Sequence, residues 1–168
     1  GSGLGYYDKA APSGDGPTNR QALAQVLADK GISVFAISPG EDTNAAVVRK
    51  DTADQYSLKT MSDLAAVQDE LKWGLTPECD VNPLCKGALE AYGITFPPKQ
   101  RETLEACSAP IAEALNSKGI DFGWLCSTQP AIQQFGFVAL EDDKNTQPAE
   151  NMTALVRDAY LDTVGDKD

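Results

Sequence analysis

Three clusters of polar residues have the side chains needed to bind a small molecule. The first holds Asp42, Thr43 and Asn44, the second Asn82, and the third Ser127, Thr128 and Gln129. Each cluster follows a predicted strand or precedes a predicted helix, so hydroxyls, amides and backbone N–H groups would gather beyond the strand ends. Ligands of doubly wound sheets bind there. The shared location therefore predicts a site for a small polar or zwitterionic solute, although each residue alone is typical of a turn or cap.

The four cysteines form a second group with a chemistry of its own: Cys79, Cys85, Cys107 and Cys126. The gaps between them lack the short C-x-x-C type of spacing that is typical of a zinc knuckle, so no metal site is expected. An even count favours two disulfide bonds, for which three pairings are possible, over four buried thiols. Disulfide bonds would place the chain outside the cytoplasm.

Residues for catalysis are scarce in this sequence. It contains no histidine, which is the commonest general base. Ser127 and Thr128 follow a predicted strand and carry hydroxyls that could act as nucleophiles. Without histidine, lysine is the remaining type of side chain that could activate them as a base near neutral pH. The carboxylates at 141–143 are typical of a solvated turn. The sequence also lacks G-x-S-x-G, P-loop and Rossmann glycine patterns, so we expect neither an enzyme nor a cofactor.

The charge of the chain excludes other classes of partner. Its formal net charge is -11 at pH 7, whereas nucleic-acid binding needs a basic patch. No apolar run reaches the ~20 residues that span a bilayer. We therefore expect no nucleic-acid partner, and the acidic balance mainly favours solubility.

Alternating helices and strands must position these residues. Helical spacing of apolar residues predicts helices over 18–31, 62–71, 83–92, 108–119, 129–134 and 151–162. Apolar, β-rich runs predict strands over 32–38, 45–49, 120–127 and 136–143, the first of them buried on both faces. This alternation predicts an α/β sheet covered on both faces. Residues 1–2 are interpreted as an expression remnant, 3–162 as a single lobe and 163–168 as a frayed tail.

Four stretches of the sequence resemble motifs of one protein family. They read "VVRKDTADQYSLKTMSDLAAVQDELKWG", "PECDVNPLCKGALEAYGITF", "IDFGWLCSTQPAI" and "FVALEDDKNTQPAENMTALVR". In the same order they are similar to "alvvrketAeky.lktiSDLa", "PEf..R.dGl.gL...YGl.f", "vdvg..fTTDg.I" and "lvvLeDDk..fPpyn..pvvR". The chain thus resembles the substrate-binding proteins of osmoprotectant ABC importers, which bind glycine betaine, choline or carnitine.

The resemblance covers roughly residues 3–160 and implies both a fold and partners. Such proteins have the type II periplasmic-binding fold, in which one lobe is inserted within another and ligand closes the cleft by a hinge motion. This chain resembles the inserted lobe, a three-layer sandwich whose central sheet is mixed but mostly parallel, with helices on both faces. The implied partners are a missing companion lobe and an ABC permease in the membrane. The implied location is extracytoplasmic, with a lipid anchor in the full-length protein.

The ligand-binding positions of the family carry different residues in this chain. The aromatic cage, which holds a quaternary ammonium by cation–π attraction, aligns with Asn44, Cys126 and Ala149, and the carboxylate-binding arginine aligns with Asn82. Each lost aromatic face weakens binding by about 0.5–2 kcal/mol, and a lost charged clamp by about 1.5–3 kcal/mol. Amides favour a neutral polar ligand such as a polyol or a sugar. The alternative is a protein-interaction or scaffold domain that has lost its small-molecule site.

The resemblance also bears on the cysteines. Cys79 and Cys85 stand where the family has an apolar anchor and a glycine, in the loop that carries Asn82. A bridge between them would fix that loop to the start of its helix and would add roughly 2 kcal/mol through chain entropy. Cys107 and Cys126 would then form the second bridge, between a helix start and an adjacent strand end.

Overall fold

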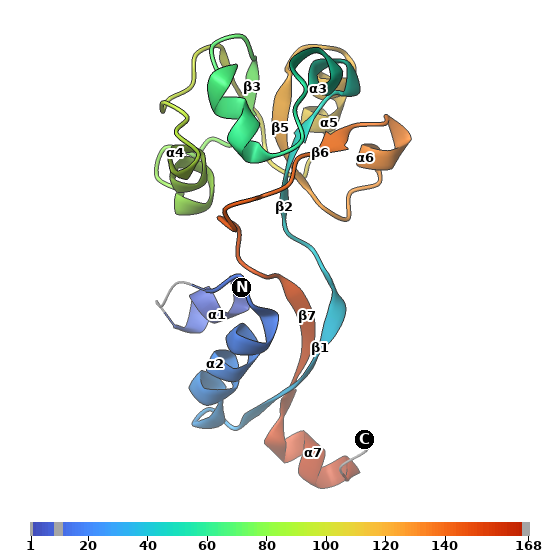
Figure 1. Cartoon of the computed structure of the whole chain (residues 1–168). Coiled ribbons are helices and arrows are strands. Elements are labelled where there is room, and N and C mark those ends of the chain that lie inside the picture. Colours follow the sequence, from blue (N-terminus) through green and yellow to red (C-terminus); the bar gives the residue numbers. More distant parts are fainter. Residues whose placement is uncertain (1, 9–11, 166–168) are drawn as a thin grey trace. The chain divides into compact units, whose positions relative to one another are not determined.

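The computed structural model describes residues 2–8 and 12–165 (Figure 1). The chain folds into two compact units. Unit 1 combines Gly1–Asp42 with Pro148–Asp168, and unit 2 is the continuous segment Thr43–Gln147. The chain therefore passes between the units twice, at 42–43 and at 147–148.

A five-stranded mixed sheet forms the centre of the described part of unit 2. Its strands lie in the order β4 (Arg101–Thr103), β3 (Trp73–Leu75), β5 (Phe122–Cys126), β2 (Asn44–Val48) and β6 (Val138–Ala139). β3 runs parallel to β4 and β5, whereas β2 runs antiparallel to β5 and β6. The predicted mixed sheet is therefore confirmed. Four of its five strands run in the same direction, and β2 runs opposite to both of its neighbours.

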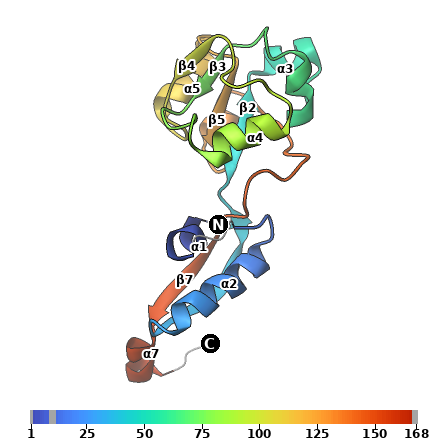
Figure 2. The same ribbon diagram turned by 90° about the vertical axis from the view of Figure 1, so that its left-hand side faces the viewer.

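Helices cover both faces of this sheet, which gives the expected three layers. On one face lie α3 (Lys50–Tyr56), the 3-10 helix η1 (Met61–Ala66), and α4 (Ala88–Ala91) with the π-helical turn η2 (Pro83–Gly87) before it. On the other face lie α5 (Ala109–Asn116) and α6 (Ala131–Gln134). Strand side chains alternate between the two layers, since Ala46 and Val48 join the first apolar cluster and Val47 joins the second. Figure 2 shows α4 in front of β2 and β5.

Local sequence signals set the starts of these helices. Ser108 precedes α5 in an extended conformation, and Pro110 lies in the first turn, where its missing N–H has no helical partner to lose. Thr60 and Asp63 form a capping box, so η1 begins at Met61 rather than after Ser62, and it ends at Ala66 rather than near residue 71.

Unit 1 contains an antiparallel pair of strands, β1 (Ile32–Glu41) and β7 (Asn151–Arg157). Its helices are α1 (Ser2–Tyr7), α2 (Gly16–Ala28) and α7 (Asp158–Val164). Asp15 caps α2, because its Oδ2 accepts a hydrogen bond from the backbone N–H of Thr18 at 2.9 Å. The small apolar core of this unit consists of Leu4, Leu23, Leu27 and Val34.

Two sequence predictions for unit 1 are wrong. The sequence predicts a helix over 151–162, but its first part is strand β7, and helix α7 starts at Asp158. Met, Ala and Leu favour a helix intrinsically, yet backbone pairing with β1 overrides this preference. The strand predicted at 32–38 extends to Glu41 and is not buried on both faces, because it lies in a two-stranded sheet in which Val34 is its buried side chain.

The ends of the predicted lobe are described in part. α7 continues to Val164, so residues 163–164 of the predicted frayed tail are helical. Residues 166–168 of that tail and residue 1 of the predicted expression remnant lie outside the described residues. The lobe boundaries at 3–162 stay a prediction. Within the described ranges, no helix combines the length and the apolar character needed to span a membrane.

Candidate functional site

The candidate site lies at one end of the unit 2 sheet. β3 and β5 are parallel, so their carboxyl ends reach the same end of the sheet, and β2 begins there because it is antiparallel to β5. Asn44, the first residue of β2, pairs with Cys126, the last residue of β5. The topology thus gathers the segments that follow β3 and β5 and the one that starts β2.

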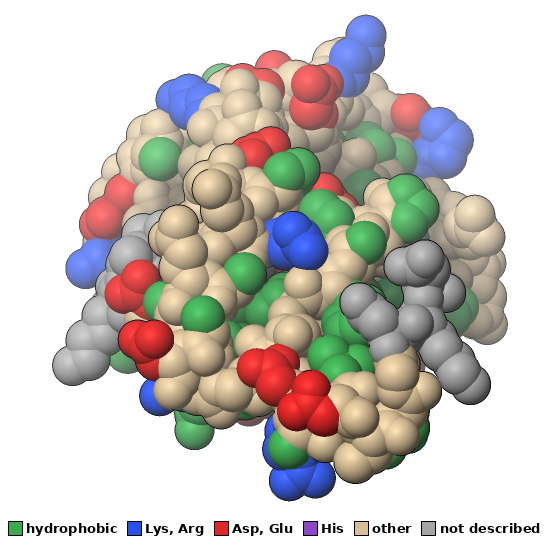
Figure 3. All heavy atoms as spheres, turned by 90° about the horizontal axis from the view of Figure 1, so that it is seen from below, with side chains coloured by type: hydrophobic (Ala, Val, Ile, Leu, Met, Phe, Trp, Pro, Cys, Tyr) green, Lys and Arg blue, Asp and Glu red, His purple; other side chains and the backbone are tan. Residues whose placement is uncertain are grey.

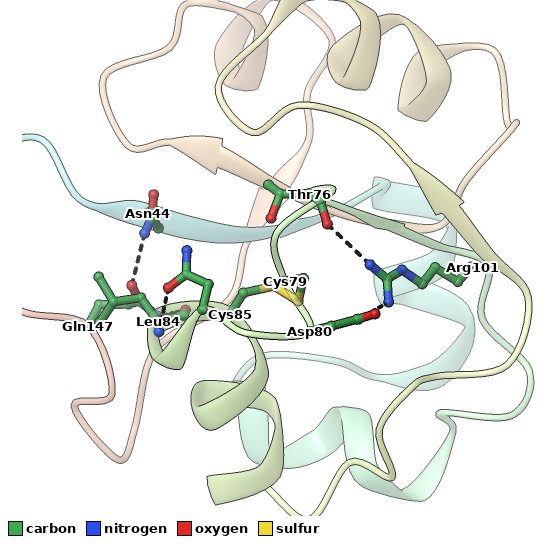
Figure 4. Close-up of a disulfide and its surroundings, with 9 residues drawn as sticks. Asn44, Thr76, Cys79, Asp80, Leu84, Cys85, Arg101 and Gln147 are labelled. Carbon is green, nitrogen blue, oxygen red and sulfur yellow. Dashed lines mark hydrogen bonds and ion pairs between the residues drawn. A yellow bond between two sulfur atoms is a disulfide. The ribbon is translucent and has the colours of Figure 1, made fainter.

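A chain of hydrogen bonds joins two of the predicted site residues, Asn44 and Asn82 (Figure 4). Asn44 Nδ2 donates to Gln147 Oε1 at 3.1 Å, and Gln147 Nε2 donates to the carbonyl oxygen of Leu84 at 2.9 Å. The backbone N–H of Leu84 donates to Asn82 Oδ1, also at 2.9 Å. Among the described residues, no hydrogen bond engages Asn44 Oδ1 or Asn82 Nδ2. The Asn44 oxygen, as an acceptor, and the Asn82 NH2 group, as a donor, therefore remain for a ligand.

A disulfide bond fixes the loop that carries Asn82. The bridge joins Cys79 and Cys85, whose Cα atoms are 5.1 Å apart, and this confirms the predicted pairing. Both cysteines are buried. Asn82 lies inside the bridged loop and caps η2 through its bond from Leu84. A groove of about 340 Å³ runs beside the loop and is lined by Asp80, Val81, Asn82, Pro83, Lys86, Gly87 and Glu90.

The second predicted disulfide bond is also confirmed, between Cys107 and Cys126 with Cα atoms 4.9 Å apart. It joins the segment before α5 to the end of β5. Directly after it, Ser127 is held against Thr43. The backbone N–H of Ser127 donates to the Thr43 carbonyl at 2.9 Å, and Ser127 Oγ accepts from the Thr43 N–H at 3.1 Å. These bonds extend the β2–β5 pairing by one residue, next to the pair formed by Asn44 and Cys126.

The remaining predicted residues divide between the two units. Thr128 is exposed and follows Ser127, and the Gln129 amide donates to the carbonyl of Ser108 at 3.2 Å. Both belong to the same end of unit 2. Asp42 instead belongs to unit 1, where its backbone N–H donates to the Glu150 carbonyl at 3.1 Å. Within unit 2 the structure therefore brings six of the seven predicted residues to one end of the sheet, and the seventh, Asp42, directly precedes Thr43 as the last residue of its segment in unit 1.

Sequence reasoning missed Gln147 and the residue that holds it, Asp142. One oxygen of the Asp142 carboxylate accepts hydrogen bonds from the Tyr92 hydroxyl and from Thr146 Oγ1, the latter at 3.0 Å, and the other accepts from the backbone N–H of Gln147 at 2.8 Å. Asp142 is half-buried, so the interpretation of 141–143 as a solvated turn is wrong for this residue. The signal that could have found it was the "LEDDK" motif itself.

The electrostatics of Asp142 follow from these contacts. Burial alone would raise the pKa of its carboxyl, but the hydrogen bonds from Thr146, Tyr92 and Gln147 outweigh burial and hold the pKa below its ordinary value. Burial and the bond to Asp142 raise the pKa of the Tyr92 hydroxyl. At neutral pH the pair therefore consists of a carboxylate acceptor and a neutral phenol donor.

Three buried polar atoms at this end of the sheet have no hydrogen-bond partner among the described residues: Thr76 Oγ1, Trp124 Nε1 and Gln129 Oε1. Thr76 directly follows β3, Trp124 lies near the end of β5, and Gln129 follows it. A buried polar atom without a partner costs about 1–3 kcal/mol. Each of these atoms therefore has a capacity for a further hydrogen bond that water or a polar solute can satisfy.

One ion pair lies near this end of the sheet. Arg101 forms an ion pair with Asp80 and donates to the Thr76 carbonyl at 3.2 Å, and Figure 4 shows this pair on the opposite side of the disulfide from Asn44 and Gln147. No group of three or more His, Cys, Asp or Glu side chains in the described ranges could hold a metal ion. The arrangement can therefore bind a neutral polar group by hydrogen bonds.

Comparison with known proteins points to one family. The family model described as the substrate-binding domain of ABC-type glycine betaine transport systems matches residues 8–165. The carnitine transport binding protein OpuCC of Listeria monocytogenes is 30% identical over 125 residues, which is 71% of this chain and 38% of that protein.

Solved structures agree with this family match. A glycine betaine/carnitine/choline ABC transporter structure is 26% identical with a TM-score of 0.81, covering 98% of this chain and 60% of the other. An ABC-transporter choline-binding protein in complex with choline has the same fold, at 20% identity and a TM-score of 0.52, covering 95% of this chain and 59% of that one. The chain thus spans well under two thirds of the length of these relatives.

Proposed function

We propose that this chain, which belongs to the family of substrate-binding domains of ABC-type glycine betaine transport systems, contributes part of a solute-binding site to an ABC-importer binding protein. The family consists of transport proteins, not enzymes. Because the chain spans 38% of its carnitine-binding relative and 60% of a solved one, the substrate and partners of the whole protein belong to the proposal.

One observation supports a specific position in unit 2 for the proposed solute site. Asn44 and Asn82 come from separate segments, and the Gln147 amide and the Leu84 backbone join them into one hydrogen-bonded chain. Side chains held this way are already oriented before a ligand arrives, which lowers the entropy lost on binding. We therefore assign solute binding to Asn44, Asn82 and their neighbours Thr43, Ser127, Thr128 and Gln129.

The proposed ligand is a small neutral polar solute. Family members recognise a quaternary ammonium, but amides occupy two of the aligned positions here, and Cys126 and Ala149 occupy the others. Cys126 is engaged in a disulfide bond, and Ala149 is buried in unit 1 with its N–H donating to the Ser13 carbonyl at 3.1 Å. Neither can offer a cation–π face. A polyol or a sugar suits the donors and acceptors better.

The proposed setting is extracytoplasmic. Two disulfide bonds support it, because such bonds persist outside the reducing cytoplasm. We propose that the full-length protein supplies a companion lobe that completes the cleft, carries a lipid anchor and delivers the solute to an ABC permease. The chain is proposed to bind neither nucleic acid nor a cofactor, in keeping with its net charge of -11.

An NMR titration of amide shifts tests the binding function, because it detects the weak affinity expected of part of a cleft. The panel holds glycine betaine, choline, carnitine, glucose, sorbitol and proline. We expect saturable shifts centred on Asn44, Asn82 and Ser127 with glucose or sorbitol, and smaller ones with glycine betaine. Shifts scattered over unit 1 and unit 2 without a common site would contradict the assignment.

A second candidate function is the binding of a protein partner through unit 1. Large apolar side chains are exposed there: Tyr6, Tyr7, Met152, Leu155, Tyr160 and Val164. Figure 3 shows a face on which apolar side chains lie at the surface among charged ones. Exposed apolar surface of this kind marks interaction sites when it is contiguous. The absence of shifts with every compound of the panel, for this chain and for the full-length protein, would favour this alternative.

A further inference from the structure

The segment 142–147 runs alongside η2 and α4 and is bonded to both of their ends. At the end of α4, the Tyr92 hydroxyl donates to Asp142, and Lys144 Nζ donates to the Ala91 carbonyl at 2.8 Å. At the start of η2, the Gln147 amide donates to the Leu84 carbonyl at 2.9 Å. The segment therefore links the helix to the first residue of β2, which is Asn44.

These bonds fix which way round the Gln147 amide lies. Its Nε2 donates to a backbone carbonyl, which can only accept, so its Oε1 is turned toward Asn44. Asn44 must then present its own Nδ2 to Gln147. The Asn44 oxygen is then left as the acceptor that a ligand can meet, beside the second N–H of the same amide.

Asp142 is the group that holds Gln147 in this place. Its carboxylate is an acceptor on both oxygens, and it accepts from the Gln147 backbone N–H at 2.8 Å on the oxygen that the Tyr92 and Thr146 hydroxyls do not use. A hydrogen bond to an ionised carboxylate is about twice as strong as one between neutral groups. An asparagine offers one accepting oxygen in place of two and carries no charge, so it would hold the Gln147 N–H more weakly.

We propose that Asp142 is a positioning residue that, through Gln147, holds Asn44 as a hydrogen-bond acceptor and so selects ligands that carry a hydroxyl or an N–H at this point. The inference rests on the proposed solute-binding function and sharpens it. A trimethylammonium group has no proton to donate, so glycine betaine cannot satisfy Asn44 Oδ1, whereas sorbitol can. Selection at this position depends on the direction of one amide: the Leu84 carbonyl sets that direction, and Asp142 holds the Gln147 backbone where its amide can reach both Leu84 and Asn44.

The test compares two charge-matched variants, Asp142→Asn and Asp143→Asn. Asp143 is the next residue, is exposed, and accepts from Ser62 rather than from Gln147. We expect Asp142→Asn to speed hydrogen exchange of the Gln147 backbone amide and to shift the side-chain amide signals of Asn44 and Gln147. Asp143→Asn should leave these signals in place. Equal effects of the two variants, or no effect of Asp142→Asn, would overturn the positioning role.

A second experiment measures the binding of sorbitol and of glycine betaine to the same proteins. In the wild type we expect sorbitol, and not glycine betaine, to shift the Asn44 side-chain amide. In Asp142→Asn the affinity for sorbitol should fall roughly fivefold to tenfold, the effect of one misplaced hydrogen bond. Gln147→Ala removes the amide without touching Asp142 and should cause a similar loss, so it serves if Asp142→Asn does not fold.

The two proposals fail in different ways. If no probe of the panel binds the wild type or the full-length protein, solute binding fails, and selection at Asn44 fails with it. If sorbitol binds the wild type and both variants equally, solute binding stands and the role of Asp142 is overturned. The exchange rate of the Gln147 backbone amide is measured without any ligand. It therefore tests the hydrogen bond between Gln147 and Asp142 independently of solute binding.

Discussion

The side-chain amides of Asn44 and Asn82 offer a ligand neutral hydrogen bonds, whereas an arginine offers hydrogen bonds from a charged group. A neutral hydrogen bond contributes about 0.5–1.5 kcal/mol, whereas one to a charged group contributes about 1.5–3 kcal/mol. An amide, however, carries a donor and an acceptor together and loses no ion hydration when a ligand covers it. The pair linked through Gln147 therefore suits weak, selective recognition of an uncharged solute.

The two disulfide bonds should differ in their accessibility to reductant. Cys79 and Cys85 are 0% and 4% exposed, whereas Cys107 and Cys126 are partly exposed. Thiol–disulfide exchange needs access to a sulfur atom. We expect a phosphine reductant, applied to the native protein, to open Cys107–Cys126 first, as read by alkylation and peptide mapping.

The denatured protein is the control for this experiment, because both bridges are then exposed and should open at similar rates. Earlier labelling of Cys79 and Cys85 in the native state would show that the bridged loop opens readily. That result would also weaken the case for a fixed Asn82.

Single residues of the site could be predicted to different degrees. Asn44, Asn82 and Ser127 stand next to predicted strand ends or helix starts, so their position in the sequence was informative. Gln147 could not be found in this way, because its partner Asn44 lies 103 residues away and the contact depends on how the segment 142–147 returns along α4. Asp42 was predicted with this group as well, and it is the residue directly before the point where the chain enters unit 2.

At the scale of elements, strand β7 shows the limit of reasoning from local pattern. Met152, Leu155 and Val156 have helical spacing, but their segment pairs with β1 over Ile32–Glu41. The helix predicted at 108–119 was right, because Ser108 and Pro110 are signals that act within one turn. Caps are local in sequence and strand pairing is not, so helix starts in unit 2 were predicted better than the strands of unit 1.

The approach of α5 to the sheet depends on glycine at two strand positions. A Cβ at Gly74 would lie 2.5 Å from Ile120 Cδ1 and 3.3 Å from the carbonyl oxygen of Phe122, and one at Gly123 would lie 3.0 Å from Ile111. We expect Gly74→Ala to lower the free energy of unfolding by about 1–3 kcal/mol through overpacking. Denaturant unfolding with the disulfide bonds intact measures it.

Gly87→Ala is the matched control for this substitution. A Cβ there meets only Pro83 at 3.8 Å, an ordinary contact, and the backbone is helical. This change should raise stability by roughly 0.5–1 kcal/mol, because alanine loses less backbone entropy in a helix. Equal effects of both substitutions would contradict the close packing of α5 on Gly74.

At the scale of the whole molecule, the two units differ in how the chain builds them. Unit 2 is one continuous segment that holds two of the apolar clusters and all four cysteines. Unit 1 needs segments from both sides of unit 2. The α/β class and the three layers could be predicted because helices and strands alternate along unit 2, whereas the pairing of β1 with β7 joins segments far apart in the chain and leaves no local signature.

We expect the fragment 43–147 to fold by itself and to form both native disulfide bonds, because its apolar clusters draw on no residue of unit 1. Dispersed amide signals and a single cooperative thermal transition would show this. Collapsed dispersion or scrambled bridges would mean that unit 2 needs unit 1 for its stability. The full chain, measured under the same conditions, is the control.

The antiparallel pairing of β1 with β7 also has a consequence for biosynthesis. The chain is made from its amino end, and domains fold as units while synthesis proceeds. β1 is synthesised before unit 2, and β7 is synthesised after it. The edge of β1 that pairs with β7 is therefore unpaired while the sheet of unit 2 forms. An unpaired strand edge is a template for wrong pairing. A chaperone that holds Ile32–Glu41 until Arg157 has emerged would therefore protect the chain against wrong pairing.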